Sequence, residues 1–379
     1  MRVFLIAGEP SGDALGQALM AGLRSLVPDV VFEGVGGPLM CAEGMESLFP
    51  MEELSVMGLA EILPKYRHLK RRIRESARAV LDAGPDVLIT IDSPDFCLRV
   101  ARLVKEASTI RTVHYVAPTV WAWRPGRAQK MAGVIDHVLA LFPFEPPLMQ
   151  AAGMECDFVG HPVVSRPVAS ASEAAAFRAD TGLGEAPLVL LLPGSREGEV
   201  ARIAPVLGET AARMARARPD LAFVLPVAGA VADRVAGIVA EWPVRPRLID
   251  PRSAGPLAKR AAFRAADVAI AASGTVSLEL AAARTPMVIA YRMNPVTFAI
   301  MRRMALTDTV TLVNLVSETR TVPEFLGPAC RADTIAPAAL DLLQGAPDQV
   351  RAMDLTMDRL GRTGDPPGLR AARAVLARL

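Results

Sequence analysis

The apolar run 187–192 ends in a loop whose residue types suit phosphate binding. In LVLLLPGSREGEV, Gly194 allows a sharp backbone turn and Ser195 can donate a hydrogen bond to an oxygen atom. Arg196 adds a planar cation with forked donors, which matches the geometry of a phosphate group. An ordinary turn between a strand and a helix has a similar composition, so this loop alone leaves both interpretations open.

A second apolar run, 267–271, leads into Ser273, Gly274 and Thr275 and then into a helix pattern. The first amide groups of a helix have no partners within the helix and form an anion site. Glu279 lies one turn into this helix, where its carboxylate repels phosphate but accepts hydrogen bonds from a ribose diol. The two loops together predict a nucleoside diphosphate site, although Glu279 could instead be a surface partner of the helix dipole.

The amino-terminal stretch RVFLIAGEPSGDALG also passes from an apolar run through glycines into a helix pattern, but it contains two carboxylates. Because Glu9 and Asp13 would repel phosphate, we assign them, with Ser11, to an acceptor site and not to a nucleotide site. Other side chains that could act on an acceptor follow later apolar runs of the first half; they are Asp92, His114, Trp121 and Trp123. One such residue is usually structural, but several at strand ends indicate an acceptor site.

These loops lie between alternating strand and helix patterns. Apolar runs predict strands at 2–7, 86–91, 111–116, 137–141, 187–192, 221–227, 267–271 and 286–291. Helix patterns occupy 14–26, 66–83, 97–106, 200–217, 257–265 and 276–284. Several runs are apolar throughout, which is typical of parallel strands buried on both faces. We therefore predict an α/β fold with two Rossmann-like, doubly wound parallel sheets that face a central cleft, with ligands at the carboxyl ends of the strands.

Length and composition agree with two domains in a reducing compartment. The chain has 379 residues, and a stretch rich in proline and small residues near 160–186 separates domain 1–165 from domain 166–349. The net charge of +2 gives no sign of a nucleic-acid partner, and the four cysteines form no CxxC pair. No two aspartates stand in DxD spacing, so we expect no metal, and we expect no cofactor. We expect neither a signal peptide nor a transmembrane helix.

An apolar stretch followed by a basic one indicates contact with an anionic membrane. The apolar residues expected to touch the bilayer are Val56, Met57, Leu59, Ile62 and Leu63. The basic residues expected at the membrane surface are Lys65, Arg67, Lys70, Arg71, Arg72 and Arg74. The alternative is a solvated helix face without a membrane role.

These motifs together resemble the lipid-A-disaccharide synthase family, which consists of inverting glycosyltransferases of the GT-B type. The matching strings span residues 6 to 315 and include AGEPSGD, GVGGPLM, MEELSVMGLAEILP, IDSPDF, HYVAPTVWAWRPGR, FPFEP, LLPGSR, ASGTVSLE, PMVIAYRMNPVTF and LVNL. The resemblance implies transfer of 2,3-diacylglucosamine from its UDP-linked form to 2,3-diacylglucosamine 1-phosphate, in Gram-negative lipid A biosynthesis. The products are a β-1,6-linked disaccharide 1-phosphate and UDP.

The resemblance also implies roles for single residues. The substrates of the family carry acyl chains, and the apolar residues between 56 and 63 would receive these chains or touch the bilayer. UDP would be bound by Gly194, Ser195, Arg196, Ser273, Gly274, Thr275, Glu279 and Asn314. Asp92 matches the position usually proposed as the general base, and we rank Glu9 second and His114 third. The family implies a cytoplasmic enzyme held peripherally at the inner membrane. It also implies a homodimer with exchanged carboxyl-terminal segments, so helices from about 350–379 would pack on the first domain or on a partner subunit.

Three other classes of protein are alternatives to this family. A UDP-N-acetylglucosamine 2-epimerase or another glycosyltransferase has the same fold, but an epimerase has no use for a membrane-facing apolar patch. A two-lobed sugar-binding protein without enzymatic activity would normally carry a secretion signal. A dinucleotide oxidoreductase is disfavoured because neither half shows GxGxxG after its first strand.

Overall fold

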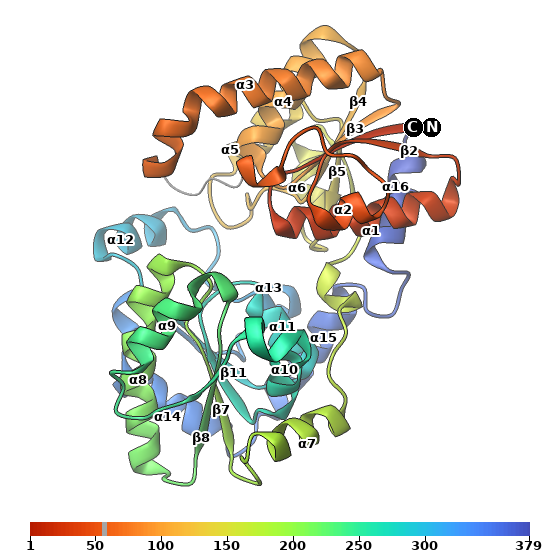
Figure 1. The fold of residues 1–379 in the computed structure, drawn as a ribbon. Helices are drawn as coiled ribbons and strands as arrows, with labels where there is room; N and C mark the ends of the chain where they lie inside the picture. Colours follow the sequence, from red (N-terminus) through yellow and green to blue (C-terminus); the bar gives the residue numbers. More distant parts are fainter. Residues whose placement is uncertain (55–58) are drawn as a thin grey trace. The chain divides into compact units, whose positions relative to one another are not determined.

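The computed structural model describes residues 1–54 and 59–379, with only the backbone described for 59–66 and 256. The chain divides into two compact units. The first contains Met1–Ser165 and Leu360–Leu379, and the second contains Arg166–Arg359. Each unit has a six-stranded sheet flanked by helices (Figure 1), which confirms the predicted α/β class.

All strand pairs of the first sheet are parallel, and their order is β2-β1-β3-β4-β5-β6. The strands are β1 Arg2–Ala7, β2 Val31–Val35, β3 Val87–Ile91, β4 Arg111–Tyr115, β5 His137–Ala140 and β6 Glu155–Phe158. The helices of this unit are α1 Pro10–Leu26, α2 Pro38–Ala42, α3 Leu59–Ala83, α4 Pro94–Ala107, α5 Gly126–Ala132, α6 Pro146–Ala151 and α16 Pro367–Leu376. The central strand β3 is buried at every position, as its apolar run predicts.

The second sheet is also parallel throughout, in the order β12-β11-β10-β7-β8-β9. Its strands are β7 Leu188–Leu192, β8 Ala222–Pro226, β9 Arg247–Ile249, β10 Val268–Ala271, β11 Met287–Tyr291 and β12 Glu324–Leu326. The helices are α7 Ala171–Asp180, α8 Glu197–Ala217, α9 Ala232–Val239, α10 Pro251–Ala265, α11 Val276–Ala283, α12 Pro295–Met304, α13 Leu312–Ser317, α14 Ala332–Leu342 and α15 Pro347–Arg359. In each sheet, therefore, the carboxyl ends of the strands lie at the same edge.

The carboxyl-terminal helix α16 returns to the first unit and lies beside α1 (Figure 1). The two helices approach so closely that a Cβ atom on Gly22 would lie 2.6 Å from the carbonyl oxygen of Gly368. The returning segment begins at Leu360 instead of near residue 350, because α15 packs on α11 and α13 within the second unit. Among the described residues, no helix has the length and apolar character needed to cross a bilayer.

Candidate active site

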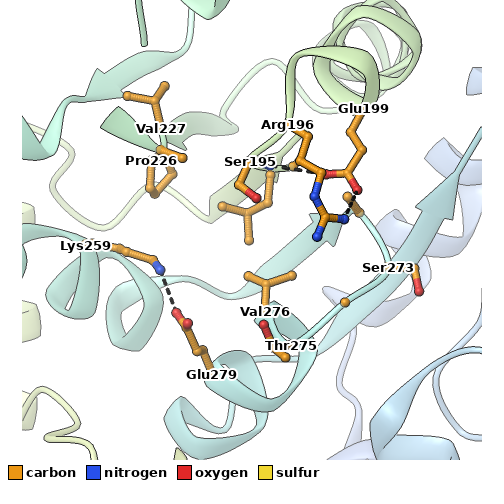
Figure 2. Close-up of a pocket in the computed structure, with 15 residues that line it drawn as sticks. Ser195, Arg196, Glu199, Pro226, Val227, Lys259, Ser273, Thr275, Val276 and Glu279 are labelled. Atoms are coloured by element: carbon orange, nitrogen blue, oxygen red, sulfur yellow. Dashed lines mark hydrogen bonds and ion pairs between the residues drawn. The ribbon is translucent and has the colours of Figure 1, made fainter. Parts of the chain in front are cut away.

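A pocket of about 400 Å³ lies at the carboxyl edge of the second sheet (Figure 2). Its walls come from the loops that follow β7, β8 and β10, together with helices α8, α10 and α11. Seven of the expected nucleotide-binding residues line it, namely Gly194, Ser195, Arg196, Ser273, Gly274, Thr275 and Glu279. Two loops that were selected separately in the sequence thus belong to one pocket.

The glycine loop after β7 contacts Glu199, a residue that no sequence motif indicated. Gly194 has a φ of +106°, and a Cβ atom there would lie 2.6 Å from Oε2 of Glu199. The same carboxylate accepts contacts of 3.4 Å from the amide of Ser195 and from the guanidinium of Arg196 (Figure 2). Because the Arg196 side chain is 65% exposed, its remaining donors are available to a ligand.

On the opposite wall, two cations flank the carboxylate of Glu279. Nζ of Lys259 lies 2.6 Å from Oε2 (Figure 2), and Nη1 of Arg166 lies 3.2 Å from Oε1. Lys259 comes from α10 and also lines the pocket, so it adds a cation that no sequence motif indicated. The amino terminus of α11 begins at Val276 in the same pocket and supplies the helix amides expected for an anion site.

Asn314, which we expected among the nucleotide-binding residues, does not line this pocket. It is 1% exposed, and its side-chain amide pairs with both backbone groups of Val322, at 2.9 and 3.0 Å. Its Nδ2 also lies 3.3 Å from Oγ1 of Thr309. The side chain therefore ties α13 to the segment before β12, and its role in nucleotide binding stays a prediction.

In the first unit, Asp92 lies directly after β3 in a strained part of the backbone. Asp92 and Ser93 have φ angles of +52° and +44°, and Val116, which follows the neighbouring strand β4, has +88°. Such angles are uncommon for residues with a Cβ atom and concentrate at functional sites. Gly8, at the end of β1, lies against this turn, since a Cβ atom on Gly8 would be 2.6 Å from Oγ of Ser93.

The expected role of Asp13 in acceptor binding is not supported by its contacts. The side chain is 3% exposed and accepts hydrogen bonds of 2.9 to 3.0 Å from the backbone amides of Gly37, Leu39 and Met40. It therefore stabilises the amino terminus of α2. Ser11 is exposed in the first turn of α1, and Glu9 is partly exposed at its N-cap. These two residues remain candidates for contact with an acceptor.

His114 faces the interior of the first unit. It is 2% exposed, and its Nδ1 lies 2.7 Å from Oγ1 of Thr90. Burial lowers the pKa of His114 to about 4, so the ring is neutral near pH 7. A ring buried in this way does not reach a substrate, and the geometry contradicts its place as the third candidate for the base.

Trp121 belongs to an aromatic cluster that is organised by a buried carboxyl group. Its indole nitrogen donates to Glu145 at 3.2 Å, and its ring contacts Phe142 and Phe144 edge-on. Glu145 is 2% exposed and also accepts from the amides of Leu141 and Phe142, at 3.0 and 2.9 Å. Burial raises the pKa of Glu145 to about 7. No sequence motif indicated Glu145, because its side-chain partner Trp121 lies 24 residues earlier in the chain, in a separate loop.

Trp123 lies in the same loop and is flanked by exposed arginines. The guanidinium carbons of Arg124 and Arg127 lie 4.3 and 5.4 Å from the centre of its ring. The ring is partly exposed, so a polar aromatic surface follows β4 on the same edge of the sheet as Asp92.

The basic side chains of helix α3 differ in their exposure and in their carboxylate partners. Arg67, Lys70, Arg71 and Arg74 are exposed. Arg72 is instead bound to Glu53 through two donors, at 2.7 and 2.8 Å, and lies over the ring of Phe49. We therefore remove Arg72 from the expected membrane surface. Val56 and Met57 lie outside the described residues, as do the side chains of Leu59, Ile62, Leu63 and Lys65.

No metal centre is evident in the described part of the chain, where no three His, Cys, Asp or Glu side chains group together suitably.

The fold is that of GT-B proteins. A UDP-GlcNAc 2-epimerase from Neisseria meningitidis, solved with UDP-GlcNAc, matches with a TM-score of 0.62 and 12% identity, over 100% of this chain and 99% of that chain. MurG of Acinetobacter baumannii matches with a TM-score of 0.55 and 12% identity, over 100% and 99% of the two chains. At such low identity these structures establish the fold alone.

The family follows from the sequence comparisons. The sequence model of the lipid-A-disaccharide synthetase family matches residues 3–365. The lipid-A-disaccharide synthase of Ruegeria pomeroyi is 66% identical, over 100% of this chain and 96% of that protein. That of Rhodospirillum centenum is 47% identical, over 99% of this chain and 94% of that protein. The chain therefore belongs to the lipid-A-disaccharide synthase family, as the sequence motifs predict.

Proposed function

We propose that the chain transfers a 2,3-diacylglucosaminyl group from its UDP-linked form to 2,3-diacylglucosamine 1-phosphate. The products are the β-1,6-linked disaccharide 1-phosphate and UDP. Family membership supports this reaction. The observation that carries it is the pocket of the second unit, which combines a glycine turn, a helix amino terminus and two cations with a carboxylate.

Different residues of the pocket bind different parts of the donor. Arg196 and the first amides of α11 bind the diphosphate and stabilise the charge that develops on departing UDP. Lys259 contributes a second positive charge and fixes the orientation of Glu279, which accepts hydrogen bonds from the ribose. No cofactor or metal is assigned a role, because these groups supply the stabilisation that the leaving group needs.

Attack on the anomeric carbon with inversion requires a base that removes the proton of the acceptor hydroxyl. We assign this role to Asp92, with Glu9 as the second candidate. The left-handed turn at Asp92 and Ser93 supports the assignment, because strain of this kind persists where it orients a functional group. The acceptor side includes Ser11, Trp121 and Trp123.

The substrates carry acyl chains, so the chain is expected to act at a membrane. Arg67, Lys70, Arg71 and Arg74 form an exposed basic surface on α3 that suits the anionic phosphates of lipids. We propose peripheral binding to the cytoplasmic face of the inner membrane through this surface, which we call the α3 basic surface.

The experiment that tests the proposal offers two reactions to the same protein. The full chain is incubated with UDP-2,3-diacylglucosamine and 2,3-diacylglucosamine 1-phosphate, and separately with UDP-N-acetylglucosamine alone. We expect mass spectrometry to detect a disaccharide 1-phosphate in the first mixture and no 2-epimer in the second. Epimerisation without disaccharide formation would replace the proposed function with that of the nearest rival class.

A further inference from the structure

Helix α12 has an apolar face that is open to solvent in the described structure. Val296, Ile300 and Met304 recur every fourth residue, with exposed fractions of 68%, 53% and 39%. This spacing keeps the three side chains on one stripe of the helix. Leu306 continues the apolar surface beyond the helix and is 58% exposed. No residue of α12 is buried, so the helix contributes little to the core of its own unit.

The opposite face of α12 holds the helix in place. Phe298 is half-buried, and a Cβ atom on Gly327 would lie 2.7 Å from its ring. This close packing directs Phe298 toward the body of the unit, so the Val296 stripe is directed outward. Figure 1 shows α12 in light blue, standing apart from the helices that flank the second sheet.

The charged residues of α12 and of the stretch that directly flanks it are all positive. The stretch 292–307 contains Arg292, Arg302 and Arg303 and has no acidic residue. Within the part of the chain that the structure describes, Arg302 and Arg303 pair with no carboxylate, and both are exposed. An apolar stripe bordered by free arginines is complementary to an anionic lipid surface, where side chains insert among acyl chains and guanidinium groups meet phosphates.

The position of α12 explains why a membrane is the matching partner. The helix follows β11, which pairs in parallel with β10, and the loop after β10 forms the nucleotide pocket. Helix and pocket therefore share the carboxyl edge of one sheet. A UDP-sugar with two acyl chains can keep those chains in a bilayer and still place its nucleotide in the pocket only if this edge lies at the bilayer surface. This step rests on the proposed function.

We infer that α12 is a membrane-docking helix, which inserts Val296, Ile300 and Met304 at the surface of an anionic bilayer. This contact belongs to the second unit and is separate from the α3 basic surface of the first. A single short helix binds a bilayer weakly and reversibly.

The first test places a reporter on the stripe. An environment-sensitive dye is attached to an Ile300→Cys variant in a Cys41→Ser background, because Cys41 is exposed and the other three cysteines are buried. We expect a blue shift of the emission on vesicles of phosphatidylglycerol and phosphatidylcholine, and little shift on phosphatidylcholine alone. A dye that stays in a water-like environment on the anionic vesicles overturns the inference.

The second test measures binding with matched variants. Ile300→Glu, and separately Arg302→Glu with Arg303→Glu, should each lower sedimentation with anionic vesicles by about tenfold. Leu355→Glu on α15 is the control, since Leu355 is also an exposed apolar residue, at 39%, but has no place in the stripe. Unchanged UDP affinity in every variant verifies the fold of the second unit. Undiminished vesicle binding by both α12 variants overturns the inference.

Turnover in detergent micelles separates this inference from the proposed function. If the α12 variants lose vesicle binding but make disaccharide normally in micelles, both proposals stand. If vesicle binding is unchanged and the donor KM rises in micelles, the stripe binds acyl chains of the donor and membrane docking is wrong. If vesicle binding is unchanged and a dimer dissociates on gel filtration, the stripe binds a second copy and docking is equally wrong. Vesicle binding by a wild-type chain that makes no disaccharide would contradict only the proposed function.

Discussion

Asp92 and Asp13 follow neighbouring strands of the first sheet, but their carboxylates have different surroundings. Asp13 accepts from three backbone amides of 37–40, whereas Asp92 occupies a strained, partly exposed turn. The sequence predicted the positions of both carboxylates, and for the same reason: each comes after a strand. It could not predict that Asp13 is satisfied by a helix about 25 residues away, because that contact depends on tertiary packing. The same limit applies to Asn314.

Asp92→Asn tests the base. Asparagine tolerates the left-handed backbone as well as aspartate does, so the turn should be retained while the proton acceptor is lost. We expect turnover to fall by about 10²–10⁴-fold with UDP affinity unchanged. The matched control is Asp95→Asn, three residues later and exposed in the first turn of α4. Near-normal turnover of the Asp92 variant would transfer the role to Glu9.

Arg196→Ala tests the diphosphate contact. The variant loses a charge-assisted hydrogen-bond donor, so we expect the affinity for UDP to fall roughly 10–100-fold, as measured by titration calorimetry. Arg213→Ala is the control, because Arg213 lies on α8, the helix that follows Arg196, and contacts Glu209. Equal UDP affinity in wild type and the Arg196 variant would remove Arg196 from the donor site.

Glu145 makes stability depend on pH. Its pKa of about 7 in the folded chain lies above the ordinary carboxyl value of 4.5, so the folded state keeps a proton that the unfolded chain has released. Stability should therefore fall as pH rises from about 4.5 to about 7. The Glu145→Gln variant has no titratable group at this position. We expect the difference in unfolding free energy between wild type and variant to change by about 1–3 kcal/mol across this window.

Urea unfolding at several pH values measures this difference. The contribution of His114, whose pKa of about 4 reflects burial, is the same in both proteins and cancels. A difference that is constant with pH would show that Glu145 is ionised in the folded state throughout.

At the scale of elements, all eight predicted strands form, and the four missed strands are the edges of the two sheets. Central strands are buried on both faces and therefore appear as continuous apolar runs. The edge strands β9 and β12 have three residues each and are incompletely buried, so they leave no such run. Edge strands β2 and β6 contain polar residues for the same reason. Helix α1 begins at Pro10 and not at residue 14, because the glycines in its first turn look like a loop in the sequence.

The α3 basic surface can be tested by reversing its charge. Lys70 and Arg74 are one turn apart and exposed, so Lys70→Glu with Arg74→Glu should weaken sedimentation with anionic vesicles by about tenfold at low salt. Arg99→Glu with Arg102→Glu on α4 makes the same change in net charge at exposed positions elsewhere on the first unit. If both pairs reduce binding equally, only overall charge matters and the α3 surface has no special role.

At the scale of the whole molecule, the order of the elements and the division into two units were both accessible from the sequence, because strand and helix patterns alternate in each half. The end of the chain was harder to assign. Helices α15 and α16 are adjacent in sequence but belong to different units, and only their packing partners distinguish them. The exchange of carboxyl-terminal segments between subunits stays a prediction.

The most direct test of the account is the stereochemistry of the product. Wild-type chain is incubated with UDP-2,3-diacylglucosamine and 2,3-diacylglucosamine 1-phosphate, and the linkage is determined by NMR while released UDP is quantified. The account predicts a β-1,6-linked disaccharide 1-phosphate with one UDP for each disaccharide, and almost none from Asp92→Asn. An α linkage, or UDP release without a disaccharide, would contradict inverting transfer by this chain.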